Sequence, residues 1–291
     1  MLAKWLIGAA VSTNGNDVPV NVWLTIAKIK VIFTGERLPN GSSNSLRITM
    51  DNGYWVGTEE REVYCEETNT TVVMNSDSSR DFKKEDFSLN ENIEYTLVLR
   101  IKFLTGKPVY ERLLQELRIL GPALTKVTEF GIVPVLHPLF FDYGAYYAAY
   151  STNLVFVTSD GPIGITSMYV TFLGCSSLNS DLAGWDVHQV TQFAGCFREC
   201  VVFNGDITAW NTSSAVEMQE MFYGASSFNR NSSSWAVNNV NNMEQMFRDA
   251  SVFNQNLSSW YVPLIPIEPL EFQYNTSSWT LPKPQWGVSP P

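Results

Sequence analysis

The sequence predicts an α+β protein in which an antiparallel β-sandwich is followed by an α/β solenoid of 25-residue coils. Strand-like segments in the first 120 residues and a 25-residue repeat in the second half lead to this prediction. The chain has 291 residues, 45% hydrophobic and 16% charged, enough for one large core or two modest ones. We therefore expect a sandwich attachment domain over residues 1–120, the solenoid over 121–262 and a proline-rich cap or arm over 263–291.

Five runs of β-branched and aromatic residues lie in the first half of the chain. Turn signals separate them, P-N-G-S-S-N from Pro39 and D-N-G from Asp51. Short strands with such turns between them favour a β-sandwich. The segment from Val109 to Leu120 fits either a helix or an extended connector to the second half. The five runs cover residues 18–33, 46–50, 62–65, 70–74 and 95–103.

Aromatic and asparagine side chains recur at a constant interval in the second half, in register with the repeat. A single unit cannot bury its own Trp and Phe, but stacked copies place each column in a continuous ladder. The repeat therefore predicts a solenoid with a structural ladder of three columns. These columns are Trp185, Trp210, Trp235 and Trp260; Phe172, Phe197, Phe222 and Phe247; and Asn179, Asn204, Asn229 and Asn254.

Each coil is expected to contain one short strand and about two turns of helix. In the stretch N-N-M-E-Q-M-F-R-D-A, Met243, Met246, Phe247 and Ala250 stand at the i, i+3, i+4, i+7 spacing of an amphipathic helix. Residues 259–262 and their counterparts look extended. The coil is therefore predicted to be an α/β unit.

Both ends of a solenoid need caps, because an end coil exposes one face of the ladder. Tyr147, which lies one full repeat before Phe172, indicates a degenerate aromatic opening coil. At the other end Pro263, Pro266 and Pro269 interrupt the expected helix. Residues 263–291 are therefore expected to form an extended arm, folded across the last coil or onto a neighbour.

The repeat also carries a family resemblance. From Trp235 to Asn254 the pattern W-x-V-x-x-V-x-x-M-x-x-M-F-x-x-A-x-x-F-N resembles the BspA-like leucine-rich-repeat surface proteins and the Mycoplasma-type lipoprotein repeat. The likeness covers about residues 124–260 and implies a leucine-rich-repeat-like solenoid, surface exposure, and adhesion or host interaction without catalysis. A sandwich similar to the polycystic-kidney-disease type often precedes such repeats, and Tyr95-Thr-Leu-Val-Leu resembles its last strand.

A second polar column leaves a choice between a calcium site and an amide ladder. It follows the asparagine column two residues later, so carboxylate and amide oxygens of both columns could bridge coils through Ca²⁺. Two coils lack a carboxylate there, which favours side-chain amides that satisfy backbone groups. The second column is Asp181, Asp206, Asn231 and Asn256.

The cysteines and histidines fit structural roles better than reactive ones. Cys175 and Cys200 share a column with two alanines, which favours small buried groups over a disulfide between coils. His188 lies on a surface column near Asp186, and no nucleophile or zinc motif accompanies it. Sequons, whose glycosylation the sequence leaves open, begin at Asn40, Asn69, Asn211, Asn231, Asn256 and Asn275.

Charge and composition narrow the function. The net charge of −10 and the lack of a basic cluster argue against nucleic-acid partners, and no apolar stretch is long enough for a transmembrane segment. No cofactor or metal motif is found. We expect a non-enzymatic structural or interaction protein on the exterior of a virus particle or cell, with protein partners in assembly or attachment. Missing export and anchoring signals favour the virion.

Two alternatives remain open at this point. A glycan-binding adhesin would need exposed aromatic side chains, such as Tyr223 and Tyr261, that line a groove. A hydrolase in the β-rich half would need carboxylates with a catalytic partner, although acids near a turn are usually solvated. The carboxylates to consider for it are Asp51, Glu59, Glu60 and Glu62.

Overall fold

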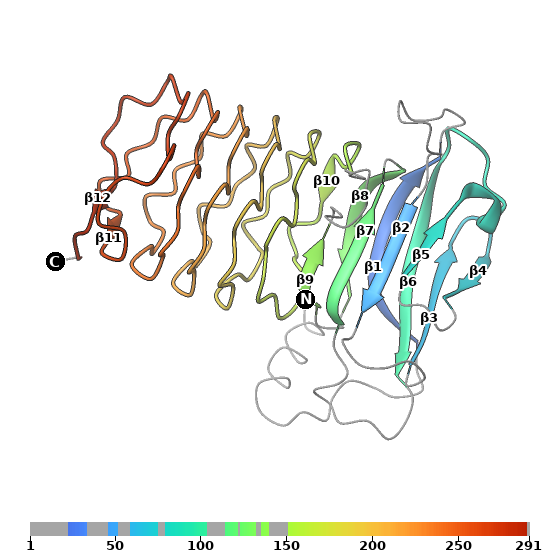
Figure 1. Ribbon diagram of the computed structural model, residues 1–291. Coiled ribbons are helices and arrows are strands. Elements are labelled where there is room, and N and C mark those ends of the chain that lie inside the picture. Colours follow the sequence, from blue (N-terminus) through green and yellow to red (C-terminus); the bar gives the residue numbers. More distant parts are fainter. Residues whose placement is uncertain are drawn as a thin grey trace.

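Two facing β-sheets form one end of the molecule, and a stack of coils extends from them to the C-terminus (Figure 1). The computed structural model describes residues 23–33, 46–51, 59–74, 79–103, 114–121, 123–131, 135–139 and 151–289. Within these ranges the 3₁₀ helix η1 (Lys84–Phe87) is the one helical element. The prediction of an α+β fold with an α/β solenoid is therefore wrong, because the described chain is nearly all β-strand and turn.

The first sheet has six strands in the order β10-β8-β1-β6-β3-β4. Its central strands pair antiparallel, but β10 pairs parallel to β8. This sheet continues past residue 120, since β8 pairs with β1 over most of its length. The strands are β1 (Trp23–Ile32), β3 (Glu59–Cys65), β4 (Thr70–Val73), β6 (Glu94–Phe103), β8 (Leu124–Phe130) and β10 (Phe156–Val157).

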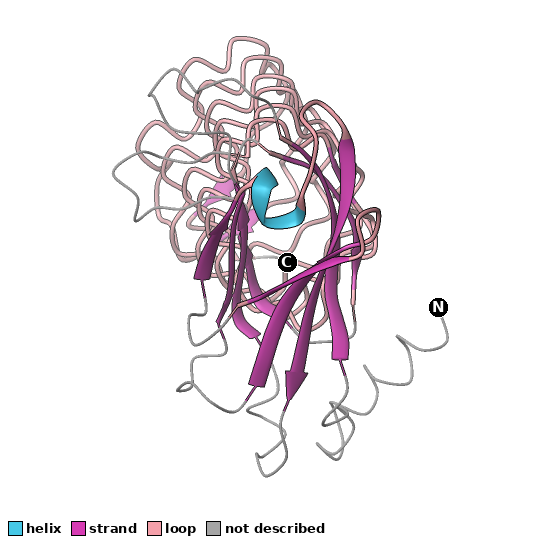
Figure 2. Ribbon diagram, turned by 90° about the vertical axis from the view of Figure 1, so that its right-hand side faces the viewer, coloured by secondary structure: helices cyan, strands magenta, loops and turns pink. Residues whose placement is uncertain are grey.

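The second sheet has four strands in the order β5-β2-β7-β9, and it faces the first across an apolar interior (Figure 2). β7 and β9 pair parallel, so each of the two sheets contains a parallel pair. The prediction of an antiparallel sandwich is therefore wrong for these strand pairs. The segment that fitted either a helix or a connector is a strand over Leu114–Leu120. The strands are β2 (Leu46–Asp51), β5 (Ser79–Phe82), β7 (Leu114–Leu120) and β9 (Val135–Leu139).

Period-two burial explains why the apolar runs of the first half are strands. Each of the five predicted runs overlaps a β-strand, namely β1, β2, β3, β4 and β6. In β1, buried side chains alternate with half-buried ones except at Ile26 and Ala27, which are both buried. The pairing with β6 shifts between Thr25 and Ala27, and such a β-bulge turns two consecutive side chains to one face. The alternation of buried and half-buried side chains therefore resumes beyond the bulge, where Ile29 and Val31 are buried in the core.

Aromatic rings stack from coil to coil along the second half of the chain. The ring centroids of Trp210 and Trp235, and of Trp235 and Trp260, are 6.3 Å apart with an interplanar angle of 13°. At the start of the stack, Trp185 packs edge-on against Phe130 of β8 at 5.8 Å. A second column stacks at spacings of 5.3, 5.7 and 5.5 Å through Phe172, Phe197, Phe222 and Phe247.

The segment predicted to be helical in each coil is a chain of turns. Phe222 and Gly224 donate their N–H groups to carbonyls of the next coil at 2.9 and 2.8 Å, whereas Tyr223 donates to Glu220 within its own coil at 3.1 Å. Glu220 and Gly224 have left-handed φ values of 56° and 69°. An α-helix would need every N–H bonded four residues back, so bonding of alternate residues to the neighbouring coil excludes it. The i, i+3, i+4, i+7 spacing of apolar residues therefore indicates which side chains are buried, and it does not indicate a helix.

The segment expected to be a proline-rich cap or arm folds onto the preceding coil as a further coil over residues 263–289. β11 (Tyr261–Val262) pairs parallel with β12 (Gln285–Trp286). Trp279 is buried, its indole N–H donates to the Gln255 carbonyl at 2.9 Å, and its ring meets Phe253 edge-on at 4.8 Å. Edge-on packing of Trp279 ends the face-to-face aromatic column.

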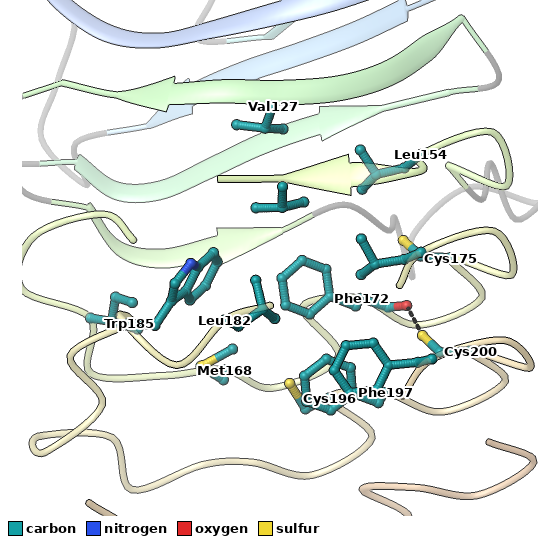
Figure 3. Close-up of a cluster of buried hydrophobic side chains, with 14 of the residues drawn as sticks. Val127, Leu154, Met168, Phe172, Cys175, Leu182, Trp185, Cys196, Phe197 and Cys200 are labelled. Atoms are coloured by element: carbon teal, nitrogen blue, oxygen red, sulfur yellow. Dashed lines mark hydrogen bonds between the residues drawn. The ribbon is translucent and has the colours of Figure 1, made fainter. Parts of the chain in front are cut away.

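The sheets and the coils share one continuous hydrophobic core. Figure 3 shows the junction, where Val127 of β8 and Leu154 lie beside Phe172 and Trp185 of the first coils. Because this core is continuous, the first coils are anchored on the six-stranded sheet. The opening coil predicted around Tyr147 lies outside the described residues.

Candidate interaction surface

The aromatic columns of the predicted structural ladder lie inside the molecule, whereas its asparagine column is exposed or half-buried. The four Trp and four Phe side chains of the ladder are all buried. The indole N–H groups of Trp210, Trp235 and Trp260 donate to carbonyls of the preceding coil at 2.9, 3.3 and 2.9 Å. A buried indole needs such an acceptor. These columns therefore fix the spacing of the coils, and any contact surface must come from other columns.

The asparagine column links the coils through side-chain to backbone hydrogen bonds. The Oδ1 atom of Asn179 accepts from the N–H of Asn204 at 2.7 Å, and the same bond joins Asn204 to Asn229 and Asn229 to Asn254 at 3.0 and 2.9 Å. In the last coil Asn254 accepts from Thr280 at 3.0 Å. The amide oxygens considered as calcium ligands are therefore engaged by backbone donors, as the favoured amide ladder requires.

The second polar column forms local turns. Oδ1 of Asp206 accepts from the backbone N–H of Thr208 at 2.9 Å and from its hydroxyl at 2.8 Å. These two hydrogen bonds hold the pKa of Asp206 below its usual range. Asn231 and Asn256 accept from the N–H two residues later at 3.0 Å in the same way. This column therefore closes a turn in each coil.

The cysteines are free, buried thiols. Cys200 donates its thiol to the Phe172 carbonyl at 2.9 Å, as Figure 3 shows. Burial raises the pKa values of Cys175, Cys196 and Cys200, and each is raised further by a neighbouring cysteine. A raised pKa keeps a cysteine as the unreactive thiol at neutral pH.

The carboxylates considered for a hydrolase are tied into cross-strand ion pairs where their side chains are described. Glu62 lies 2.6 Å from Arg100 and Glu60 lies 2.5 Å from Lys102, both across the β3–β6 ladder. Arg100 also covers the ring of Tyr64 at 4.6 Å. These pairs match acids to bases on one sheet surface. Asp51 and Glu59 lie on β2 and β3, but their side chains are outside the described set.

His188 is an exposed side chain beside one acid. Its Nδ1 atom lies 2.6 Å from Oδ1 of Asp186. The nearby Ser214 hydroxyl donates to the backbone carbonyl of His188 at 2.7 Å and not to the imidazole. The arrangement therefore holds the imidazole to Asp186 without activating a hydroxyl. The imidazole of His137, on β9, is outside the described side chains.

A row of alternating arginine and tyrosine side chains runs along the surface of the stack; we call it the Arg–Tyr row. It consists of Arg198, Tyr223, Arg248 and Tyr274. The guanidinium groups of Arg198 and Arg248 lie 4.8 and 5.3 Å from the centroid of Tyr223, one coil on either side, and Arg248 lies 5.1 Å from Tyr274. Each coil thus contributes one member, in contact with the next.

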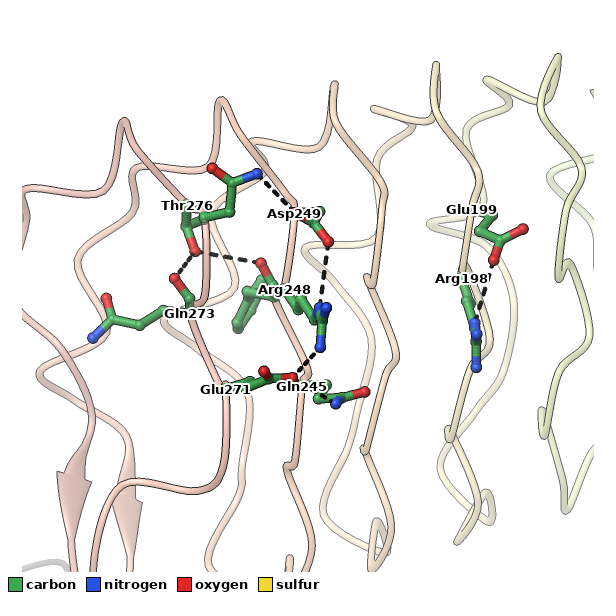
Figure 4. Close-up of polar contacts among 10 residues, drawn as sticks. Arg198, Glu199, Gln245, Arg248, Asp249, Glu271, Gln273 and Thr276 are labelled. Carbon is green, nitrogen blue, oxygen red and sulfur yellow. Dashed lines mark hydrogen bonds and ion pairs between the residues drawn. The ribbon is translucent and has the colours of Figure 1, made fainter.

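Acids fix the arginines of the row in place. Arg198 pairs with Glu220 at 2.5 Å. Figure 4 shows Arg248 paired with Glu271 and Asp249. Burial acts to lower the pKa of both guanidinium groups, but these carboxylates more than offset it and the pKa values are raised. The arginine side chains stay half-buried, so the row is a preorganised surface that contains charge and aromatic area together.

Sequence reasoning missed this row, although the signal is present. Leu173, Arg198, Tyr223 and Arg248 form one column of the 25-residue repeat, in register with the core columns. The two tyrosines considered for a glycan-binding groove, Tyr223 and Tyr261, have other surroundings. Both faces of Tyr223 are covered by arginine, and Tyr261 is half-buried in β11. A hollow lies between the last coils, lined by Glu217, residues 241–244 and residues 265–270, and neither tyrosine lines it.

The remaining polar candidates are distributed over the surface. The sequon residues Asn69, Asn211, Asn231, Asn256 and Asn275 are exposed, and Asn40 is outside the described residues. The described part of the chain contains no group of three or more His, Cys, Asp or Glu arranged to hold a metal ion. Across the same ranges, no helix has the length and apolar character that crossing a bilayer requires.

Comparison with known proteins reaches only the stacked coils. The family model described as Mycoplasma protein of unknown function, DUF285, matches residues 166–279. No curated protein and no solved structure matches the chain. The match supports the likeness to a Mycoplasma-type repeat, whereas the leucine-rich-repeat and polycystic-kidney-disease likenesses find no support in it.

Proposed function

We propose that this protein is a non-enzymatic structural or interaction protein, which presents its coils on the exterior of a cell or virus particle for assembly or attachment to protein partners. The observation that carries this proposal is the Arg–Tyr row. Tyr and Arg are enriched at protein interfaces and dominate their binding energy. Here they occupy one line on the stack, at the repeat distance of the coils.

Preorganisation supports the same function. A flexible arginine pays about 0.5–1.5 kcal/mol in lost side-chain freedom when a partner immobilises it. In the row, Arg198 and Arg248 are already held by Tyr223 and by carboxylates. Most of this cost is met during folding, so a partner would meet a surface that is rigid in advance. Stacked coils commonly offer such extended surfaces.

The chemistry of the acidic and imidazole groups supports a non-enzymatic role. Glu60 and Glu62 neutralise lysine and arginine on the sheet, and His188 contacts Asp186 alone among the charged groups described. A hydrolase would need a carboxylate or imidazole aimed at a reacting group. These side chains stabilise the protein instead.

The test combines localisation with substitution of the row. A mass-spectrometric inventory of particle, envelope, medium and soluble fractions shows where the native chain resides. The double variant Tyr223→Ala/Arg248→Ala is then compared with Tyr169→Ala, an exposed tyrosine outside the row. We expect the native chain in the particle or envelope fraction. The amount of chain in that fraction is expected to fall about tenfold or more for the double variant and to stay unchanged for Tyr169→Ala.

Two outcomes would overturn the proposal. One is a native chain that stays in the soluble intracellular fraction. The other is a double variant that keeps its folded content, measured by circular dichroism, and co-fractionates as strongly as the native chain.

A further inference from the structure

The ladder of backbone hydrogen bonds between coils opens at the last coil. Met168, Phe193 and Met218 each donate their N–H to a carbonyl of the next coil at 2.8, 2.8 and 2.9 Å. The isolated parallel bridges of this column end at Asn242 in the same way. In the described residues no such bond leaves Met243. The Met243 N–H is therefore left without a backbone acceptor in the described part of the last coil.

Prolines and an extra residue cause the opening. Phe222 donates to Met246, whereas Phe247 donates to Phe272, a longer step along the chain, so the last coil contains one additional residue before this point. Pro266 occupies the position whose N–H would meet the Asn241 carbonyl, and proline has no N–H. The hydrogen bonds resume at Gln245, which donates to Leu270 at 3.0 Å.

A hollow of about 510 Å³ lies at the opening. One wall is apolar, with Ile267 and Leu270 exposed at 75% and 65%. Three acidic residues line it, Glu217, Glu244 and Glu268, and no lysine or arginine of the described chain does. The Glu268 carboxylate also accepts from the Gln273 side-chain amide at 2.9 Å. Lys283 of the last coil donates to the Trp279 carbonyl at 3.1 Å and covers its ring, and it does not line the hollow.

We propose that this hollow, the terminal cleft, binds an extended segment of a partner protein that carries lysine or arginine next to an apolar residue. An extended segment satisfies the Met243 N–H and the Asn241 carbonyl by strand addition. Its cation is attracted by Glu217, Glu244 and Glu268, and its apolar side chain covers Ile267 and Leu270. The inference rests on the proposed interaction function and adds the chemistry of a partner to it.

Charge argues for a basic partner rather than a second copy of this chain. The chain has a net charge of −10, so two copies repel each other, and the cleft carries the same sign as the chain. A basic segment is attracted both by the acidic residues of the cleft and by the negative net charge of the chain.

The test measures binding of a capped fluorescent peptide, Leu-Lys-Leu-Lys-Leu, to the purified full chain by fluorescence anisotropy. We expect saturable binding that the double variant Glu244→Lys/Glu268→Lys weakens about tenfold or more. The matched control, Glu85→Lys/Asp160→Lys, changes two exposed acids elsewhere by the same charge and is expected to retain binding. Hydrogen exchange in the bound state is expected to slow at Met243.

Three results would overturn the inference. The first is equal weakening by both double variants, which would assign the binding to overall charge. The second is binding without protection of residues 241–245. The third is self-association in sedimentation that Glu244→Lys/Glu268→Lys abolishes, which would assign the cleft to a second copy. A native chain that stays in the soluble intracellular fraction, with intact peptide binding, would instead count against the proposed function alone.

Discussion

The β-sheets and the stacked coils bury similar apolar side chains but join them over different distances along the chain. In the sheets, β1 pairs with β6, so that Trp23 lies opposite Lys102. In the stack, the asparagine bonds join residues 25 apart, and indole bonds join residues 28 apart. The sheets therefore form only when distant segments meet, whereas each coil depends on its two neighbours.

The two regions also satisfy their polar groups differently. The sheet surface carries cross-strand ion pairs such as Glu62–Arg100 and Lys126–Glu94. The coils rely on asparagine oxygens, indole N–H groups and backbone carbonyls. We therefore expect the coils to tolerate few changes at repeated positions, because each such side chain contacts the coil before it and the coil after it.

The largest effect expected from breaking the stack is that of Phe222→Ala. Phe222 is fully buried and stacks on Phe197, Phe228 and Phe247 at 5.7, 3.8 and 5.5 Å. Removing the ring is expected to lower the free energy of unfolding by about 3–5 kcal/mol. Hydrogen exchange is expected to quicken in the coils while β1 and β6 stay protected. Equal loss of protection in both regions would show that the stack and the sheets unfold as one unit.

Glycine substitution tests close backbone contacts in both regions. A Cβ at Gly205 in the stack would lie 1.7 Å from the Ser180 carbonyl oxygen, and one at Gly131 would lie 1.7 Å from that of Thr25 in β1. Gly205→Ala and Gly131→Ala are each expected to cost about 2–3 kcal/mol in urea unfolding.

Gly224→Asn is the control, because Asn275 has the equivalent left-handed backbone in the next coil but one, with φ of 58°. It is expected to change stability by less than about 0.5 kcal/mol. A loss for Gly224→Asn as large as that for Gly205→Ala would contradict the assignment to close contact.

Asn229→Ala tests the asparagine column with a smaller effect. The change removes the oxygen that accepts from the Asn254 N–H at 2.9 Å and from the Gln255 side chain at 2.8 Å. A loss of about 1–2 kcal/mol is expected in chemical denaturation, because a backbone donor loses its acceptor. Asn238→Ala, at an exposed position, is expected to stay within about 0.5 kcal/mol. Similar losses of unfolding free energy for Asn229→Ala and Asn238→Ala would contradict the stabilising role of the asparagine column.

Asp206→Asn is expected to have the smallest effect and to appear only in acid. The pKa of Asp206 is lowered in the folded state by Thr208, so its contribution is present above the unfolded pKa of about 3.9 and is lost as pH falls through the folded value. Asparagine forms the same turn in the Asn231 coil.

The Asp206→Asn variant should match the native chain at pH 7 and lose less stability between about pH 5 and pH 3. Denaturation midpoints at both pH values check this. Asp81→Asn is the comparison in the sheets, where hydrogen bonding by Arg47 lowers the pKa of Asp81. Unchanged acid sensitivity in Asp206→Asn would contradict the role of this carboxylate.

Part of the architecture can be derived from local pattern. Alternating apolar runs located β1 and its partners, because strand burial has a period of two residues. The helix predicted around Met243 was wrong, because its spacing of buried side chains also fits a turn chain whose alternate N–H groups bond the next coil. The Arg–Tyr row was missed because its members are not apolar, although they share the 25-residue spacing.

By itself, the sequence determined which side chains recur and which strands alternate, since both follow from spacing along the chain. Only the tertiary structure decided that β8 and β10 extend the first sheet, that residues 263–289 form a coil, and that a cleft opens beside Met243. The physical reason is that backbone N–H groups can bond to partners in their own coil or in the next one. Which partner is bonded depends on neighbours that the local sequence does not contain.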